Sequence, residues 1–194
     1  MKLRLPVVFC LALALFTVGA HAQIGLYLNP QAIRISNSKA DSGPFAFLRD
    51  GVTSRMFYGV NFGGYYGFYH PAAADVAVEL RDTIVHGSDA SLNNFSLGLR
   101  VAPRRTLAVF KPYASVAVGA ASSKPPTSSV HRTKATVNGY VGVDYPATKF
   151  LDIRVVEVGY GTASLINSGN FNGPAAFPNS RLLSFSSGLV FRIK

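Results

Sequence analysis

Five charged residues stand out because they lie in segments that otherwise alternate between apolar and polar side chains. They are Glu79, Arg81, Arg100, Arg154 and Glu157. In an extended strand, residues two apart share a face, so Glu79 and Arg81 lie opposite Val78 and Leu80. A lone buried charge is costly, whereas buried charges of both signs can pair. We therefore expect these five residues to form an interior salt-bridge network. The alternative is a proton or ion path through rearranged pairs.

The histidines offer weaker evidence of chemistry. His86 lies beside Ser88 and Asp89, and His131 follows two serines. A Ser-His-acid triad is defined by geometry and not by neighbours in sequence, and such loop clusters arise readily by chance. His70, His86 and His131 fall on different connections and lack the spacing of metal ligands. We therefore predict no catalytic residue, no metal site and no cofactor.

The N-terminal 22 residues have the features of a secretory signal peptide. They begin with two basic residues, continue as an apolar run from Leu5 to Val18 and end in the small-residue pattern Ala20-His21-Ala22. The run is shorter than the roughly 20 residues that a spanning helix needs. Cleavage before Gln23 would remove Cys10, the one cysteine. The mature chain would then hold neither a disulfide framework nor a thiolate metal site.

The composition is unusual for a soluble exported protein. Hydrophobic residues make up 48% of the chain and charged residues 14%. Seventeen basic residues face nine acidic ones after the predicted signal. An exported chain with this excess meets anionic lipid or lipopolysaccharide phosphate rather than nucleic acid. The low charged fraction indicates a surface that does not face water everywhere.

Eight segments after the signal show period-two alternation, and no useful helical pattern appears. They are residues 23–35, 56–69, 73–84, 91–102, 107–121, 135–145, 150–162 and 181–194. The connections after the second, fourth and sixth segments are tight, while those between vary from short to long. This rhythm predicts one all-β domain over residues 23–194, an eight-stranded antiparallel up-and-down β-barrel with both termini at one end.

The polar face of these segments distinguishes a transmembrane barrel from a soluble one. It carries mostly Gly, Ser, Asn and Tyr, whereas a face in water would carry many Lys and Glu. Among the basic residues, only Arg34, Arg81, Arg100 and Arg154 are assigned to this inner face, and the others to the two rims. None is placed at mid-depth on the lipid face, where it would cost roughly 2–4 kcal/mol. We expect a packed polar interior without an open pore, since eight strands leave room only for side chains.

Three local features complete the predicted barrel. A bulge near Val155-Val156 would bring Glu157 to the same face as Arg154. Pro30 predicts a bulge or an edge irregularity in the first strand. The apolar insert at residues 44–48 of the first long connection either covers the barrel mouth or packs on its rim, and we favour the rim.

The last segment carries a further pattern. The chain resembles the eight-stranded outer-membrane β-barrel family, the OmpA- and OmpX-like barrels, from Gln23 to Ile193. The insertion signal of that family is a polar residue, a glycine and two terminal hydrophobic residues at fixed spacing, and Ser186, Gly188, Phe191 and Ile193 match it. The resemblance implies an outer-membrane location. It also implies periplasmic chaperones and the barrel-assembly machinery as partners during biogenesis.

These features predict a monomeric, non-enzymatic outer-membrane barrel with a structural or surface-interaction role. Seven basic residues against four acidic ones at the outer rim suggest contacts with lipopolysaccharide phosphates through Lys124, Arg132 and Lys134. An adhesive surface formed by residues 36–55 and 163–180 is the competing interaction hypothesis. Alternatives of other classes are a lipid A-modifying barrel enzyme, a narrow channel and a soluble ligand-binding barrel.

Overall fold

The structure is a computed structural model that describes residues 23–40, 46–126, 131–163 and 180–193, except the side chain of Arg132. The predicted signal peptide lies outside these ranges and stays a prediction. Most of the connection at residues 163–180 also lies outside them. No helix in the described part of the chain is long and apolar enough to cross a membrane.

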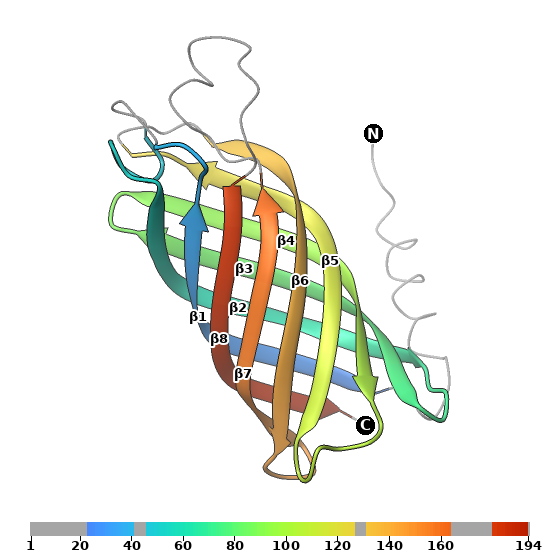
Figure 1. Cartoon of the computed structure of the whole chain (residues 1–194). Coiled ribbons are helices and arrows are strands. Elements are labelled where there is room, and N and C mark those ends of the chain that lie inside the picture. Colours follow the sequence, from blue (N-terminus) through green and yellow to red (C-terminus); the bar gives the residue numbers. More distant parts are fainter. Residues whose placement is uncertain (1–22, 41–45, 127–130, 164–179, 194) are drawn as a thin grey trace, which may run out of the picture.

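Eight antiparallel strands close into one barrel, in which each strand pairs with the next and β8 pairs with β1 (Figure 1). The strands are β1 (Ile24–Ser36), β2 (Ser54–Tyr69), β3 (Ala74–Gly87), β4 (Ala90–Pro103), β5 (Lys111–Lys124), β6 (Arg132–Pro146), β7 (Leu151–Ala163) and β8 (Ser180–Ile193). This confirms the predicted all-β, eight-stranded up-and-down barrel. The fifth strand begins later than expected, because Leu107 and Phe110 bridge each other in a turn of their own.

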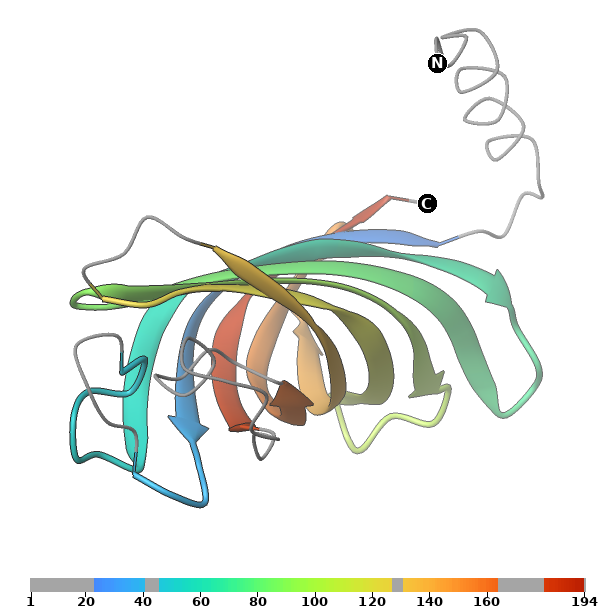
Figure 2. The ribbon, with the colours of Figure 1, turned by 90° about the horizontal axis from the view of Figure 1, so that it is seen from above.

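The two ends of the barrel differ. The terminal end carries Ile24 and Ile193 together with the connections at residues 70–73, 104–110 and 147–150. At the opposite end, called the loop end here, β1, β3, β5 and β7 finish (Figure 1). Viewed from above, the strands curve around a common axis (Figure 2). In the orientation of bacterial outer-membrane barrels, the terminal end faces the periplasm.

The outer wall of the barrel is apolar. Leu26, Leu28, Leu97, Leu99 and Val116 point outward, and each is about half exposed or more. The strands are 13–16 residues long, whereas a tilted strand needs about 9–11 residues to cross a bilayer. A continuous apolar band of this kind requires lipid around it. The barrel is therefore a transmembrane one.

Two charged residues differ from their expected placement. Arg34 is exposed on the outer wall and not in the interior, because the alternation of β1 continues through Pro30 and puts Ile33 and Ile35 inside. Arg34 lies near the loop end and donates a hydrogen bond to Ser54 at 3.3 Å. Asp82 is one of the four acidic residues that the sequence places at the outer rim, but it lies within β3 on the outward face.

The irregularity expected at Pro30 is a gap in strand pairing and not a bulge. Asn29 and Pro30 have no partner residues on β8, although the register on either side of them is the same. Proline has no N–H to donate to a neighbouring strand, which accounts for the lost pairing. The outer face of this region forms a shallow, mostly apolar groove.

The bulge expected near Val155-Val156 is confirmed. Arg154 pairs with Gly188 and Glu157 pairs with Ser186, so β7 has one extra residue between them. Val155 and Val156 both face outward. Arg154 and Glu157 consequently point into the same interior.

Residues 46–48, the described part of the apolar insert in the first connection, pack into the loop end, so the prediction that the insert packs on the rim was wrong. Phe47 and Leu48 are each 1% exposed and belong to one cluster with interior residues such as Ile35 and Val85. Phe47 stacks on Phe57 with ring centroids 5.1 Å apart. The interior at this end is apolar, so covering it removes more apolar surface from water than packing on the rim would.

Candidate functional site

Glu157 lies at the centre of the charged interior. Its carboxylate accepts two hydrogen bonds from Arg81, at 2.6 and 2.8 Å. It also accepts one from the hydroxyl of Tyr113 at 2.6 Å and one from Ser186 at 3.1 Å. Arg154 contacts the same carboxylate at 3.3 Å. A buried carboxylate held by this many donors is charged and fixed in position.

The network extends from Glu157 to two further carboxylates. Arg81 also donates to Glu79 at 3.0 Å. Arg154 donates to Asp144 at 3.1 Å, and Arg100 donates to the other oxygen of Asp144 at 2.7 Å. All five residues of the predicted network are buried and connected. With Asp144, three arginines face three carboxylates, so the cluster is neutral overall.

Four tyrosines pack between the arginines, and each lies against a glycine of a neighbouring strand. The guanidinium of Arg81 lies 3.8 Å from the ring centre of Tyr140, and that of Arg100 lies 3.5 Å from that of Tyr113. The four pairs are Tyr65 with Gly25, Tyr27 with Gly63, Tyr113 with Gly142 and Tyr140 with Gly159. A methyl group on any of these glycines would collide with the ring, so the inner-face glycines make room for the aromatic layer.

Asp144 and the tyrosines are the network members that sequence reasoning did not assign to it. Asp144 has inner-face parity in β6, but it lies two residues from Pro146 at the strand end, where a rim position was equally compatible with the pattern. A register shift between Val143 and Asp144 places it beside Arg154. Charge balance could have indicated a further acidic member of the network, because three arginines and two glutamates leave one arginine without a counterion.

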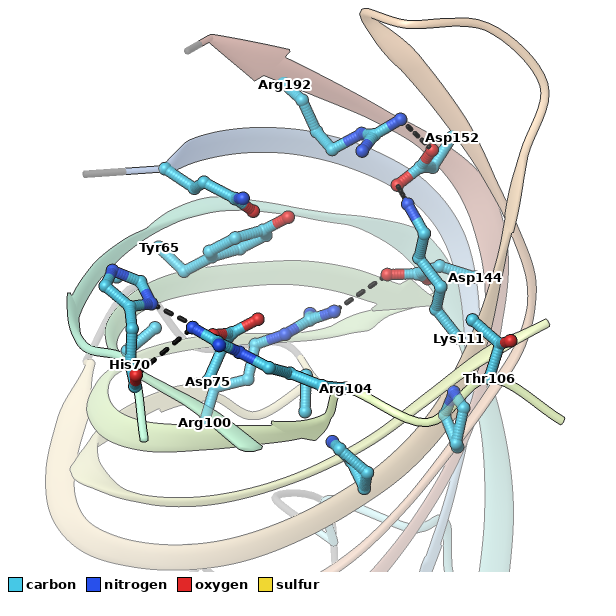
Figure 3. A pocket seen from close by; sticks show the side chains of 16 residues that line it. Tyr65, His70, Asp75, Arg100, Arg104, Thr106, Lys111, Asp144, Asp152 and Arg192 are labelled. Atoms are coloured by element: carbon cyan, nitrogen blue, oxygen red, sulfur yellow. Dashed lines mark hydrogen bonds and ion pairs between the residues drawn. The ribbon is translucent and has the colours of Figure 1, made fainter. Parts of the chain in front are cut away.

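A second set of ion pairs lies at the terminal end (Figure 3). Asp152 contacts Lys111 at 3.5 Å and Arg192 at 2.8 Å. On the opposite wall, Asp75 accepts a hydrogen bond from Arg104 and contacts His70, both at 3.0 Å. The pair formed by Asp144 and Arg100, which belongs to the interior network, lies between these two groups (Figure 3).

At the loop end, Arg55 joins the insert to the barrel. It donates to the carbonyl oxygen of Phe47 at 3.4 Å and to that of Gly87 at 2.6 Å, and it pairs with Asp89. Burial opposes the charged form of Asp89, but the hydrogen bond and charge of Arg55 outweigh it, so the pKa of Asp89 lies below its ordinary value. The carboxylate of Asp89, the acid that lies near His86 and Ser88 in the sequence, is therefore paired with Arg55. The side chain of His86 is exposed on the outward face.

The three residues expected to contact lipopolysaccharide lie on β5 and β6 at the loop end. Lys124 is half-buried at the last position of β5, and Lys134 is exposed. The backbone of Arg132 pairs with Ser123. The two strands are neighbours, so the structure brings the three backbone positions together at one rim.

The predicted insertion signal lies on both faces of β8. Phe191 and Ile193 face outward and are half exposed, whereas Ser186 faces inward and is buried. Gly188 lies so close to β1 that an added Cβ atom would stand 2.7 Å from the Cα atom of Asn29. Two of the four residues therefore also contribute to the interior and to the β1–β8 closure.

Comparison with solved structures agrees with this geometry. Neisserial surface protein A matches with a TM-score of 0.58 and 14% identity, over 87% of this chain and 96% of that one. The attachment invasion locus protein Ail of Yersinia pestis matches with a TM-score of 0.55 and 11% identity, over 89% and 99%. The chain has the fold of an eight-stranded outer-membrane β-barrel. No protein-family model and no curated sequence matches this barrel.

Proposed function

We propose that this protein is a non-conducting, non-enzymatic barrel of the outer membrane that interacts with partners through its loop end. The observation that carries the proposal is the filled interior. The charge network occupies the middle of the barrel, and Phe47 and Leu48 close the apolar loop end. A filled barrel offers no continuous water path, so we expect the function of the protein to reside on its exposed surfaces.

The partner that the loop end fits best is an anionic saccharide, with lipopolysaccharide phosphate as the form present in an outer membrane. Lys39, Arg49, Lys134 and Arg181 are exposed at this end. Clustered cations raise the local concentration of anions and contact phosphates directly. The Ail structure is that of a complex with the heparin analogue sucrose octasulfate. That is a polyanionic saccharide on a barrel of the same fold.

Charge reversal tests this role. Lys124→Glu, Arg132→Glu and Lys134→Glu together are expected to weaken association with lipopolysaccharide vesicles about tenfold or more at low salt. Lys149→Glu, a single charge reversal at an exposed position of the terminal end, is a control for position and is expected to bind normally. Unchanged binding by the triple variant would contradict the proposal. Deleting residues 164–179 in a parallel adhesion assay tests the competing loop hypothesis.

Assembly follows from the same proposal. The outer wall is apolar, and the edge of β8 must pair with β1. Both features require a route that keeps the chain unfolded in the periplasm. We propose periplasmic chaperones and the barrel-assembly machinery as transient partners and a monomer as the final state.

A further inference from the structure

A cavity of about 750 Å³ opens at the terminal end of the barrel. We call it the vestibule, and Figure 3 shows its lining side chains converging from opposite walls. Its volume lies within the usual range of small-molecule sites. Neither the central network nor the loop-end surface accounts for a space of this size. The vestibule is therefore a separate candidate for binding.

Cations outnumber carboxylates in the vestibule. Its cationic side chains are Arg100, Arg104, Lys111 and Arg192, and its carboxylates are those of Asp75, Asp144 and Asp152. Each carboxylate already contacts two basic groups. Asp152 contacts Lys111 and Arg192, and Asp144 contacts Arg100 and Arg154. Cationic side chains therefore exceed carboxylates by one in this lining, and not every N–H group of its arginines has an acceptor among the described residues.

Arg100 shows this shortage most clearly. Its side chain is 6% exposed. Its Nη2 atom donates to Asp144 at 2.7 Å, and its guanidinium packs 3.5 Å from the ring centre of Tyr113 and 4.4 Å from that of Tyr65. Its Nη1 atom has no hydrogen-bond partner among the described residues. A buried donor without an acceptor is costly, and the side chain that carries it lines the cavity.

We propose that the vestibule binds a small anion whose carboxylate or phosphate group pairs with the guanidinium of Arg100. Lys111, Arg104 and Arg192 supply positive charge nearer the mouth. Arg192 lines the same cavity and is placed to add a second contact. The tyrosine packing fixes the guanidinium before binding, which lowers the entropy cost of holding a ligand.

Titration calorimetry of the folded protein in dodecyl maltoside at low salt tests this, with inorganic phosphate and succinate as separate probes. Saturable binding of at least one probe is expected, and the probe that binds identifies the anion class. Lys111→Gln, a partly exposed position at the cavity wall, is expected to weaken binding several-fold. Arg100→Gln removes the central donor and is expected to weaken it about tenfold or more.

Lys149→Gln is the matched control, since it removes the same charge from the same end outside the vestibule. Far-UV circular dichroism and heat-modifiable gel migration identify variants that fold, and the Lys111→Gln result stands if Arg100→Gln does not fold. Absence of binding by both probes up to about 10 mM would overturn the proposal. An equal loss in Lys111→Gln and Lys149→Gln would also overturn it, because it would reflect net charge alone.

Discussion

Glu157 is the residue on which the interior most depends, because Arg81, Arg154, Tyr113 and Ser186 all contact its carboxylate. Glu157→Gln keeps the shape but removes the charge, which leaves arginines in the interior without their main counterion. Removing one partner from a buried pair costs about 3–5 kcal/mol. We expect a loss of this size in the free energy of unfolding, measured by urea titration in phospholipid vesicles.

Asp89→Asn is the control for this variant, because it makes the same carboxyl-to-amide change in a pair that water reaches. Exposed ion pairs contribute about 0–1 kcal/mol. The side chain of Asp89 is 46% exposed and that of Arg55 is 9% exposed, but Arg55 keeps the carbonyl oxygens of Phe47 and Gly87 as acceptors when the carboxylate becomes an amide. Equal effects of the two substitutions would contradict the view that burial makes the Glu157 contacts strong.

For individual residues, the sequence predicted most of the charges that lie inside but not how they pair. The parity of Glu79, Arg81 and Arg100 followed from simple alternation. The direct contact between Arg81 and Glu157 joins residues on β3 and β7, which are not neighbouring strands. It depends on barrel diameter and stagger, which no local pattern encodes. Arg34 was misplaced because a gap in pairing at Pro30 does not change parity, whereas a bulge does.

At the scale of the strands, closure between β1 and β8 depends on close backbone approach at Gly188. Gly188→Ala would place a Cβ atom 2.7 Å from the Cα atom of Asn29, and backbone atoms cannot move aside easily. We expect about 1–3 kcal/mol of destabilisation and a smaller folded fraction in vesicle insertion assays. Gly139→Ala is the control, since its nearest neighbour would be 3.9 Å away. Indistinguishable folding of the two variants would argue against close packing at this seam.

The insert at the loop end can be tested by thiol labelling, because the predicted mature chain has no cysteine. Val85→Cys lies in the interior at 0% exposure. We expect it to resist a water-soluble maleimide until Phe47→Gly and Leu48→Gly remove the cover. His86→Cys, exposed next to it in β3, is expected to react in both backgrounds. Rapid labelling of Val85→Cys in the intact protein would show that the loop end is open.

The strands were predictable from period-two alternation, but the position of the insert was not. Residues 44–48 are apolar without alternation, and a short apolar run of this kind fits a rim contact as well as a cap. The choice depends on the apolar lining that Ile33, Ile35 and Val85 present inside the barrel. That lining comes from three positions on two strands and is visible only once the barrel is closed.

For the whole molecule, β8 is the strand that completes the barrel. Deleting residues 191–194 removes Phe191 and Ile193 from the outer wall and shortens the pairing of β8 with β1 and β7. An open barrel exposes unpaired strand edges to lipid, which is strongly unfavourable. We expect export to the periplasm to continue while membrane assembly stops, as followed by cell fractionation and heat-modifiable gel migration. Normal assembly of the truncated chain would contradict this role of β8.

The central claim is that this transmembrane barrel is filled and does not conduct. The direct measurement is the conductance of the purified protein in a planar lipid bilayer, with heat-modifiable migration confirming that the sample is folded. We expect no stepwise channel openings from the intact protein, because the network around Glu157 and the insert at Phe47 block the axis in succession. Well-defined channels of reproducible conductance would contradict this claim.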